Sequence, residues 1–149
     1  MEVVQFTNIQ AEFMERIRHA VYCNVATVDL KNRPRLRIMH VIWEGSTGWV
    51  ISWPKSHKAK HLANNAYVSL AYSGNPHKPV YIECTASWES NPAEQQRIWE
   101  LHKETPAPLG FDPTPYYGTI ENEYFGLLCF IPWRIEIAEL GKESIIWRR

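Results

Sequence analysis

Residues 80–88 alternate strictly between apolar and polar side chains, and this feature constrains the fold more than any other. The apolar positions are Val80, Ile82, Cys84, Ala86 and Trp88, with Tyr81, Glu83, Thr85 and Ser87 between them. Successive side chains of a β-strand point to opposite faces of the sheet. The segment is therefore predicted to be a strand with one buried face, which is typical of antiparallel sheets.

The period of two recurs along the chain. Strands are predicted over residues 21–29, 35–44, 49–53, 67–72 and 124–138, the last bent at Pro132. Turn-forming residues separate them at 31–34, 45–48 and 73–76. With segment 80–88 this makes six strands in mostly sequential hairpins, which favours a closed or partly closed antiparallel barrel over a parallel sheet.

Three segments have helical character. Asn8 is predicted to cap an amphipathic helix whose buried face carries Ile9, Phe13, Met14, Ile17 and Val21. A short helix is predicted over 56–64, and Asn91 with Pro92 is predicted to start another that runs to about Lys103. Residues 105–117 contain four prolines and are predicted to form a loop. We expect one domain spanning residues 1–149.

Composition narrows the class of function. Lys plus Arg and Asp plus Glu are both 16, so no net charge attracts the protein to nucleic acid or to an anionic membrane. The longest apolar run, 125–133, is too short to span a bilayer, and residues 1–5 do not resemble a secretion signal, so we expect a cytoplasmic protein. Cys23, Cys84 and Cys129 are predicted to be reduced core thiols.

A basic segment offers a site for an anion. Residues 53–62 place Lys55, His57, Lys58 and Lys60 around Ser56, which opens a predicted helix. Unpaired N–H groups at a helix start attract anions, and Lys58 adds a full charge. Arg35 and Arg37 share one face of the preceding strand, where a guanidinium beside apolar side chains suits a phosphorylated aromatic ligand. Basic loop residues are more often simply solvated, however, and the pattern alone ranks that interpretation slightly ahead.

Segments 51–62 and 34–39 together resemble the pyridoxamine 5'-phosphate oxidase-like, FMN-binding split-barrel family. The similarity extends over the first two thirds of the chain and fades after Trp88. It implies a mainly β (α+β) fold: a six-stranded antiparallel split β-barrel of Greek-key type with an N-terminal helix and short connecting helices. It also implies a homodimer with FMN bound at the interface, each site being completed by the partner chain.

The resemblance assigns roles to eight residues. It implies that Arg37 and Lys58 hold the FMN phosphate, and that Ser56 and His57 belong to the same helix-opening motif, His57 standing where the family has Arg. The backbone of Ile38 and Met39 would line the isoalloxazine. Ile51 and Ser52 would support the ring and the ribityl chain.

Three departures from the family's oxidases bear on the reaction. The oxidases carry a Lys at the position of Ile42 and a Gln at that of Pro79, and they end in an Arg-x-His-type motif that segment 143–149 lacks. The chain is therefore more similar to the short, general-stress-type members than to enzymes that oxidise vitamin B6. We expect an FMN-dependent oxidoreductase of unknown substrate whose chemistry belongs to the flavin, with no catalytic side chain. The alternatives are a non-catalytic flavin-binding or redox-sensing stress protein, or a relative that binds haem or deazaflavin.

Other candidate residues have plainer explanations. His57 and His61 have the spacing of a metal pair but no matching acidic or Cys partner, so phosphate contact or solvent exposure is expected for both, and no metal site. His40 should face away from Arg37 and be packed or hydrogen-bonded rather than ligate haem. Tyr116, Tyr117 and Tyr124 could cap a pocket, although they could equally anchor the proline-rich loop.

Overall fold

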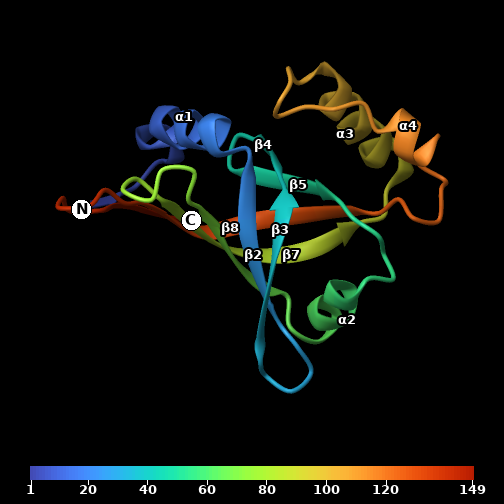
Figure 1. Ribbon diagram of the computed structural model, residues 1–149, viewed down its shortest axis with the longest axis horizontal. Coiled ribbons are helices and arrows are strands. Elements are labelled where there is room, and N and C mark those ends of the chain that lie inside the picture. Colours follow the sequence, from blue (N-terminus) through green and yellow to red (C-terminus); the bar gives the residue numbers. More distant parts are fainter.

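A computed structural model describes residues 1–149 as a curved, mostly antiparallel nine-stranded sheet with helices along its rim (Figure 1). The strands are β1 (Glu2–Val3), β2 (Tyr22–Val28), β3 (Pro34–His40), β4 (Ile42–Glu44), β5 (Thr47–Ile51), β6 (Tyr67–Tyr72), β7 (Val80–Glu89), β8 (Leu127–Ile137) and β9 (Ile145–Arg148). The helices are η1 (Phe6–Asn8, a 3-10 turn), α1 (Gln10–Ala20), α2 (His57–Asn64), α3 (Pro92–Glu104) and α4 (Thr114–Tyr117). Mainly β structure with few helices is thus confirmed.

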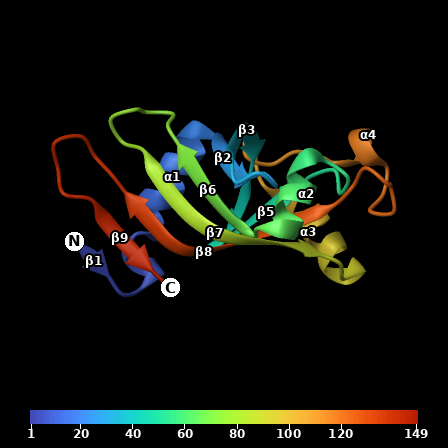
Figure 2. The ribbon, with the colours of Figure 1, turned by 90° about the horizontal axis from the view of Figure 1, so that it is seen from below.

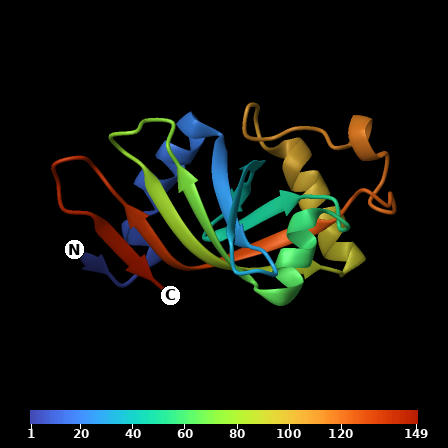
Figure 3. The same ribbon diagram turned by 60° about the horizontal axis from the view of Figure 1, so that its bottom comes forward.

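Antiparallel pairing carries the sheet round almost a full turn. β2 pairs with β3 on one side and with β6 on the other, and β6, β7, β8 and β5 follow in order. β5 returns to β4, which continues β3 beyond Val41. The long strands β7 and β8 run along the molecule (Figure 3). One edge of β3 has no strand partner, so the sheet is open between β3 and the end of β5.

The main core fills the concave side of this sheet. Cys23, Val25 and Thr27 are buried on alternate positions of β2, as the period of two requires. Phe13 and Ile17 of α1 are buried over one end, where the Phe13 and Trp43 rings meet edge to face with centroids 5.2 Å apart. Burial of these large side chains is the main force that stabilises the barrel.

A smaller core lies on the outside of β5 and β8. Ile98 and Trp99 of α3 pack there with Trp49, Phe125 and Leu127. This contact holds α3 against the sheet and brings residues 105–126, which include α4, over the open side of β5. The end of the proline-rich segment is thus helical, whereas the sequence predicted only a loop.

The expectation of six strands in a Greek-key arrangement is not confirmed, because the sheet has nine strands. The predicted strand 35–44 is divided at Val41 into β3 and β4. The short parallel pair β1 and β9 was not predicted, and it lies at the end of the molecule opposite α3 and α4 (Figure 2).

Local differences from the sequence predictions have simple causes. Asn8 does not cap α1 but ends the 3-10 turn, where its Oδ1 accepts a hydrogen bond from Gln5 N at 3.1 Å. Val21 belongs to neither neighbouring element and adopts φ +63° as the chain leaves α1. The bend at Pro132 is present as a register shift, where Cys84 opposes Pro132 and Glu83 opposes Arg134, so that Trp133 is the extra residue.

The cysteines form no disulfide, and burial raises the pKa of the Cys23 thiol to about 12. None of the helices combines the length and the apolar character needed to cross a membrane.

Candidate functional site

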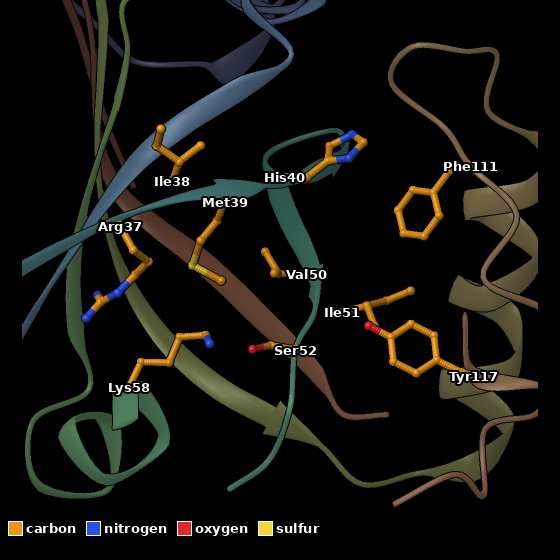
Figure 4. Close-up of a pocket in the computed structure, with 10 residues that line it drawn as sticks. All are labelled: Arg37, Ile38, Met39, His40, Val50, Ile51, Ser52, Lys58, Phe111 and Tyr117. Carbon is orange, nitrogen blue, oxygen red and sulfur yellow. The ribbon is translucent and has the colours of Figure 1, made fainter. Parts of the chain in front are cut away.

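A cavity of about 320 Å³ lies where the sheet is open, between the free edge of β3 and the end of β5 (Figure 4). Its walls come from four parts of the chain: Arg37, Ile38, Met39 and His40 of β3, Val50, Ile51 and Ser52 at the end of β5, Lys58 of α2, and Phe111 and Tyr117 of the segment after α3. We call it the cationic cavity, because its only charged side chains are Arg37 and Lys58.

The register of the β2–β3 pair fixes Arg37. Arg37 stands opposite Val25, and its Nη1 donates to the Val25 carbonyl at 3.2 Å and to Thr27 Oγ1 at 2.7 Å. Thr27 Oγ1 is in turn 2.9 Å from Nδ1 of the buried His61. Because the Thr27 hydroxyl accepts from Arg37, its own proton is free to donate to His61, so β2 and α2 together hold the guanidinium in place.

Lys58 enters the cavity from the first turn of α2. Its Nζ donates to Ser56 Oγ at 3.2 Å, and its ammonium points toward the hydroxyl of the buried Ser52 (Figure 4). Ser52 is positioned by its backbone N–H, which donates to the Gly126 carbonyl at 2.9 Å. Gly126 can approach this closely because it lacks a side chain: a Cβ there would lie 2.7 Å from the backbone carbonyl oxygen of Ser52.

The two cations repel each other. Burial lowers the pKa of Lys58 below its ordinary 10.5, and the charge of Arg37 lowers it further. Burial, and then the charge of Arg35, likewise lowers the pKa of Arg37. Asp29 is already engaged with Arg33 at 2.9 Å and with Arg35 at 3.6 Å. This end of the cavity therefore carries uncompensated positive charge, next to the positive end of the α2 dipole.

The rest of the cavity is apolar and aromatic. Met39, Val50 and Ile51 line its middle, and Phe111 and Tyr117 close the end farthest from Arg37 and Lys58 (Figure 4). Burial raises the pKa of Tyr117, so its phenol stays protonated and uncharged. The cavity thus suits a ligand with an anionic group at one end and a flat apolar body at the other.

Six of the eight residues predicted for the site line this cavity: Arg37, Ile38, Met39, Ile51, Ser52 and Lys58. Ser56 and His57 do not line it. Ser56 occupies the N-cap position of α2 without capping it, and its hydroxyl instead accepts from Lys58. His57 begins α2 and is exposed.

His61 is neither exposed nor part of the cavity wall. It is buried against Thr27, and burial lowers its pKa, so the ring is neutral. The expectation of phosphate contact or solvent exposure is wrong for His61, because the Thr27 hydroxyl offers a buried polar partner that α2 alone does not reveal.

Three lining residues were not predicted, namely His40, Val50 and Phe111, whereas Tyr117 was one of three tyrosines that could cap a pocket. Alternation along β3 does turn His40 to the face opposite Arg37, but β3 is an edge strand and the cavity extends round that edge. The aromatic residues of the proline-rich segment were the one available signal for Phe111 and Tyr117. No group of three or more His, Cys, Asp or Glu side chains is arranged to hold a metal ion.

Several solved structures share this fold. A protein from Clostridium acetobutylicum related to general stress protein 26 of B. subtilis superposes with a TM-score of 0.75 at 16% identity, covering 95% of this chain and 94% of that one. An FMN-binding, pyridoxamine 5'-phosphate oxidase-related protein from Nostoc punctiforme gives 0.70 at 16% identity, covering 95% and 90%. HutZ, the haem storage protein of Vibrio cholerae, gives 0.65 at 18% identity, covering 87% and 94%.

At these identities the superpositions show the fold alone, and no curated protein matches the chain by sequence. The sequence itself nevertheless matches the family model described as pyridoxamine 5'-phosphate oxidase over residues 9–108, about two thirds of its length. The matched region runs from the start of α1 through α3 and contains β3, β5 and α2, which build the cationic end of the cavity. The chain therefore belongs to the pyridoxamine 5'-phosphate oxidase family.

Proposed function

We propose that this protein is a flavoprotein that binds FMN in the cationic cavity. The observation that carries the proposal is the pair of half-buried cations, Arg37 and Lys58, facing a cavity that holds no carboxylate and is otherwise apolar. A phosphate would neutralise both charges and accept hydrogen bonds from both side chains. The resemblance to an FMN-binding protein of the same fold supports this choice of ligand.

The other predicted residues have roles that fit the same ligand. The free edge of β3 offers the backbone of Ile38 and Met39 to the polar rim of a flavin ring. Ile51 would pack against the ring, and the Ser52 hydroxyl would face the ribityl chain. Ser56 would act indirectly by holding Lys58, and His57 would stay at the solvent-exposed start of α2.

We infer that the protein acts as an oxidoreductase. Bound flavin supplies the hydride and electron transfer, while the chain positions it and limits the access of water. The cavity contains no carboxylate and no thiol, so no side chain is assigned as a catalytic acid, base or nucleophile. Oxidation of vitamin B6 is not proposed, because Ile42 is apolar and buried on β4.

We further propose that the protein is a homodimer. Leu36 and Ile38 of β3 are 67% and 70% exposed, and Tyr67 of β6 and Tyr81 of β7 are 61% and 42% exposed. The strand registers place all four side chains on the same outer face of the sheet. Exposed apolar side chains that gather on one face favour an interaction surface. A second copy would cover it and would bring its own residues close to Ile38 at the cavity.

A second candidate ligand is haem. The haem storage protein of similar fold favours it, as does His40, the only histidine that lines the cavity. The paired cations are matched better by a phosphate than by an iron ligand set, so FMN remains the preferred ligand.

Titration of the purified apo-protein with FMN, riboflavin, a deazaflavin and haemin tests these proposals. We expect FMN to bind more tightly than riboflavin, which has the same ring but no phosphate. Sedimentation of wild type and of Leu36→Asp, a change outside the cationic cavity, tests the dimer, and the variant should be monomeric. Equal affinity for FMN and riboflavin, or a Soret band with haemin alone, would overturn the assignment of FMN.

Bleaching of the bound flavin by NADH or NADPH without air, followed by turnover of an acceptor, separates an enzyme from a sensor.

A further inference from the structure

A second hollow of about 340 Å³ adjoins the cationic cavity and shares His40, Phe111 and Tyr117 with it. Tyr22, Pro108 and Tyr116 form its remaining walls. We call it the aromatic hollow. Figure 4 shows His40 and Phe111 side by side, away from Arg37 and Lys58, so the hollow lies beyond the apolar end of the proposed flavin site. Neither the phosphate contacts nor the ring contacts proposed above use it.

The aromatic rings around the hollow offer flat surfaces at several angles. The His40 ring lies between Tyr22 and Phe111, with centroids 5.3 Å and 5.5 Å away. Phe111 meets Tyr116 nearly at a right angle, with centroids 6.1 Å apart. Such walls favour a planar aromatic guest, which can stack on one ring and meet the edge of another. Tyr22 and Tyr116 are 58% and 73% exposed, so the hollow opens to solvent beside side chains that can rotate.

His40 gives the hollow its polarity. Its Nε2 is buried and has no hydrogen-bond partner, one of two side-chain nitrogens in the protein in that condition. Burial lowers the pKa of His40, so the ring is neutral. A neutral imidazole has one donor and one acceptor nitrogen.

No side-chain hydrogen bond in the structure fixes the tautomer of His40, so the proton can reside on Nδ1. In that tautomer Nε2 is a buried acceptor without a partner, which is unfavourable.

We propose that the aromatic hollow binds a planar aromatic molecule bearing a hydroxyl or N–H group that donates a hydrogen bond to Nε2 of His40. A rotation of the exposed Tyr22 side chain would uncover this nitrogen. The proposal that the hollow is the substrate or electron-acceptor site of a flavoprotein rests on the proposed function. The proposal that it binds such a molecule rests on His40 and the aromatic walls alone.

Two probes that differ in a single group test the proposal. 1-Naphthol carries a hydroxyl donor, and 1-methoxynaphthalene has the same ring with the donor blocked. Calorimetric titration of wild type should show 1-naphthol binding roughly 3- to 10-fold more tightly, the worth of one neutral hydrogen bond. The variant His40→Phe keeps a ring between Tyr22 and Phe111 but removes the acceptor, and it should abolish the preference. His19→Gln, at an exposed histidine of α1 outside both cavities, should retain it.

Nitrogen NMR of wild type provides a readout that does not depend on the stability of a variant. The Nε2 resonance of His40 should shift as 1-naphthol is added and should stay in place with 1-methoxynaphthalene. Equal affinities for the two probes in wild type, absence of binding by both, or a preference that survives in His40→Phe would overturn the proposal.

The same titrations separate this proposal from that of the flavin site. Lys58→Met should weaken FMN binding and leave 1-naphthol binding unchanged, because Lys58 does not line the aromatic hollow. If the 1-naphthol preference is absent while FMN still binds, only the proposal for the aromatic hollow is refuted. If FMN does not bind while the preference is present, only the flavin proposal is refuted.

Discussion

Lys58→Met should weaken FMN binding by about 10- to 150-fold. Lys58 Nζ has a single protein partner, Ser56 Oγ at 3.2 Å, so at least one of its N–H groups is free for a ligand. A hydrogen bond between charged groups contributes about 1.5–3 kcal/mol, which corresponds to that range in the dissociation constant. Methionine keeps most of the aliphatic length of lysine, so the wall of the cavity should stay filled.

Quenching of flavin fluorescence measures the affinity directly, and comparing FMN with riboflavin isolates the phosphate. Lys58→Met should lower the affinity for FMN and leave that for riboflavin unchanged. Lys60→Met is the matched control: it removes a positive charge from the same helix at an exposed position outside the cavity, and it should change FMN affinity little. If Lys58→Met loses FMN and riboflavin affinity equally, Lys58 supports the fold of the site and does not bind phosphate.

Three further predictions concern the protein without ligand. Because the pKa of Lys58 is lowered on folding, its charge destabilises the folded protein below that lowered pKa, and this penalty disappears as the pH rises toward the ordinary value of 10.5. In urea unfolding without ligand, Lys58→Met should therefore be more stable than wild type by a larger margin at pH 7 than at pH 10. An equal margin at the two pH values would contradict the repulsion. Tyr72→Phe removes the acceptor that lies 2.8 Å from the buried Trp43 Nε1 and should lower the free energy of unfolding by about 1–3 kcal/mol; the exposed Tyr81→Phe should be neutral, and equal effects in the two variants would count against the buried bond. Gly126→Ala places a Cβ 2.6 Å from Pro54 Cγ, so overpacking should lower the free energy of unfolding by about 1–3 kcal/mol. It should also weaken FMN binding by displacing Ser52, and wild-type values in both assays would refute the close approach.

The cationic end of the site could be predicted from the sequence because its parts are close together in the chain. β3, the β4–β5 hairpin and α2 follow one another within residues 34–64, so strand alternation and a helix start indicated an anion site at Arg37 and Lys58. The pattern alone ranked simple solvation of these residues slightly ahead, and the family resemblance assigned them to the phosphate. The prediction that Ser52 belongs to the site came from the family resemblance.

The aromatic end could not be predicted beyond the suggestion that Tyr117 could cap a pocket, because it depends on packing between distant segments. Phe111 and Tyr117 reach the cavity only because α3 packs outside β5 and β8 through Trp49, Ile98 and Leu127. Nothing local in a proline-rich segment encodes that contact. The pairing of β1 with β9 likewise joins residues about as far apart as the chain allows, Glu2 with Ile146, over two positions only.

Charge balance explains why the site should prefer FMN to other flavins. A phosphate monoester carries about −1.5 to −2 charges at pH 7, and Arg37 and Lys58 together supply two positive charges at the cavity. His61 is a further basic residue near Arg37, but burial lowers its pKa and keeps it neutral. It orients Arg37 through Thr27 without adding a further charge. Riboflavin would leave both cations unpaired in a partly dry site, which is unfavourable. The same repulsion that weakens the empty protein thus becomes the source of selectivity for a doubly charged phosphate.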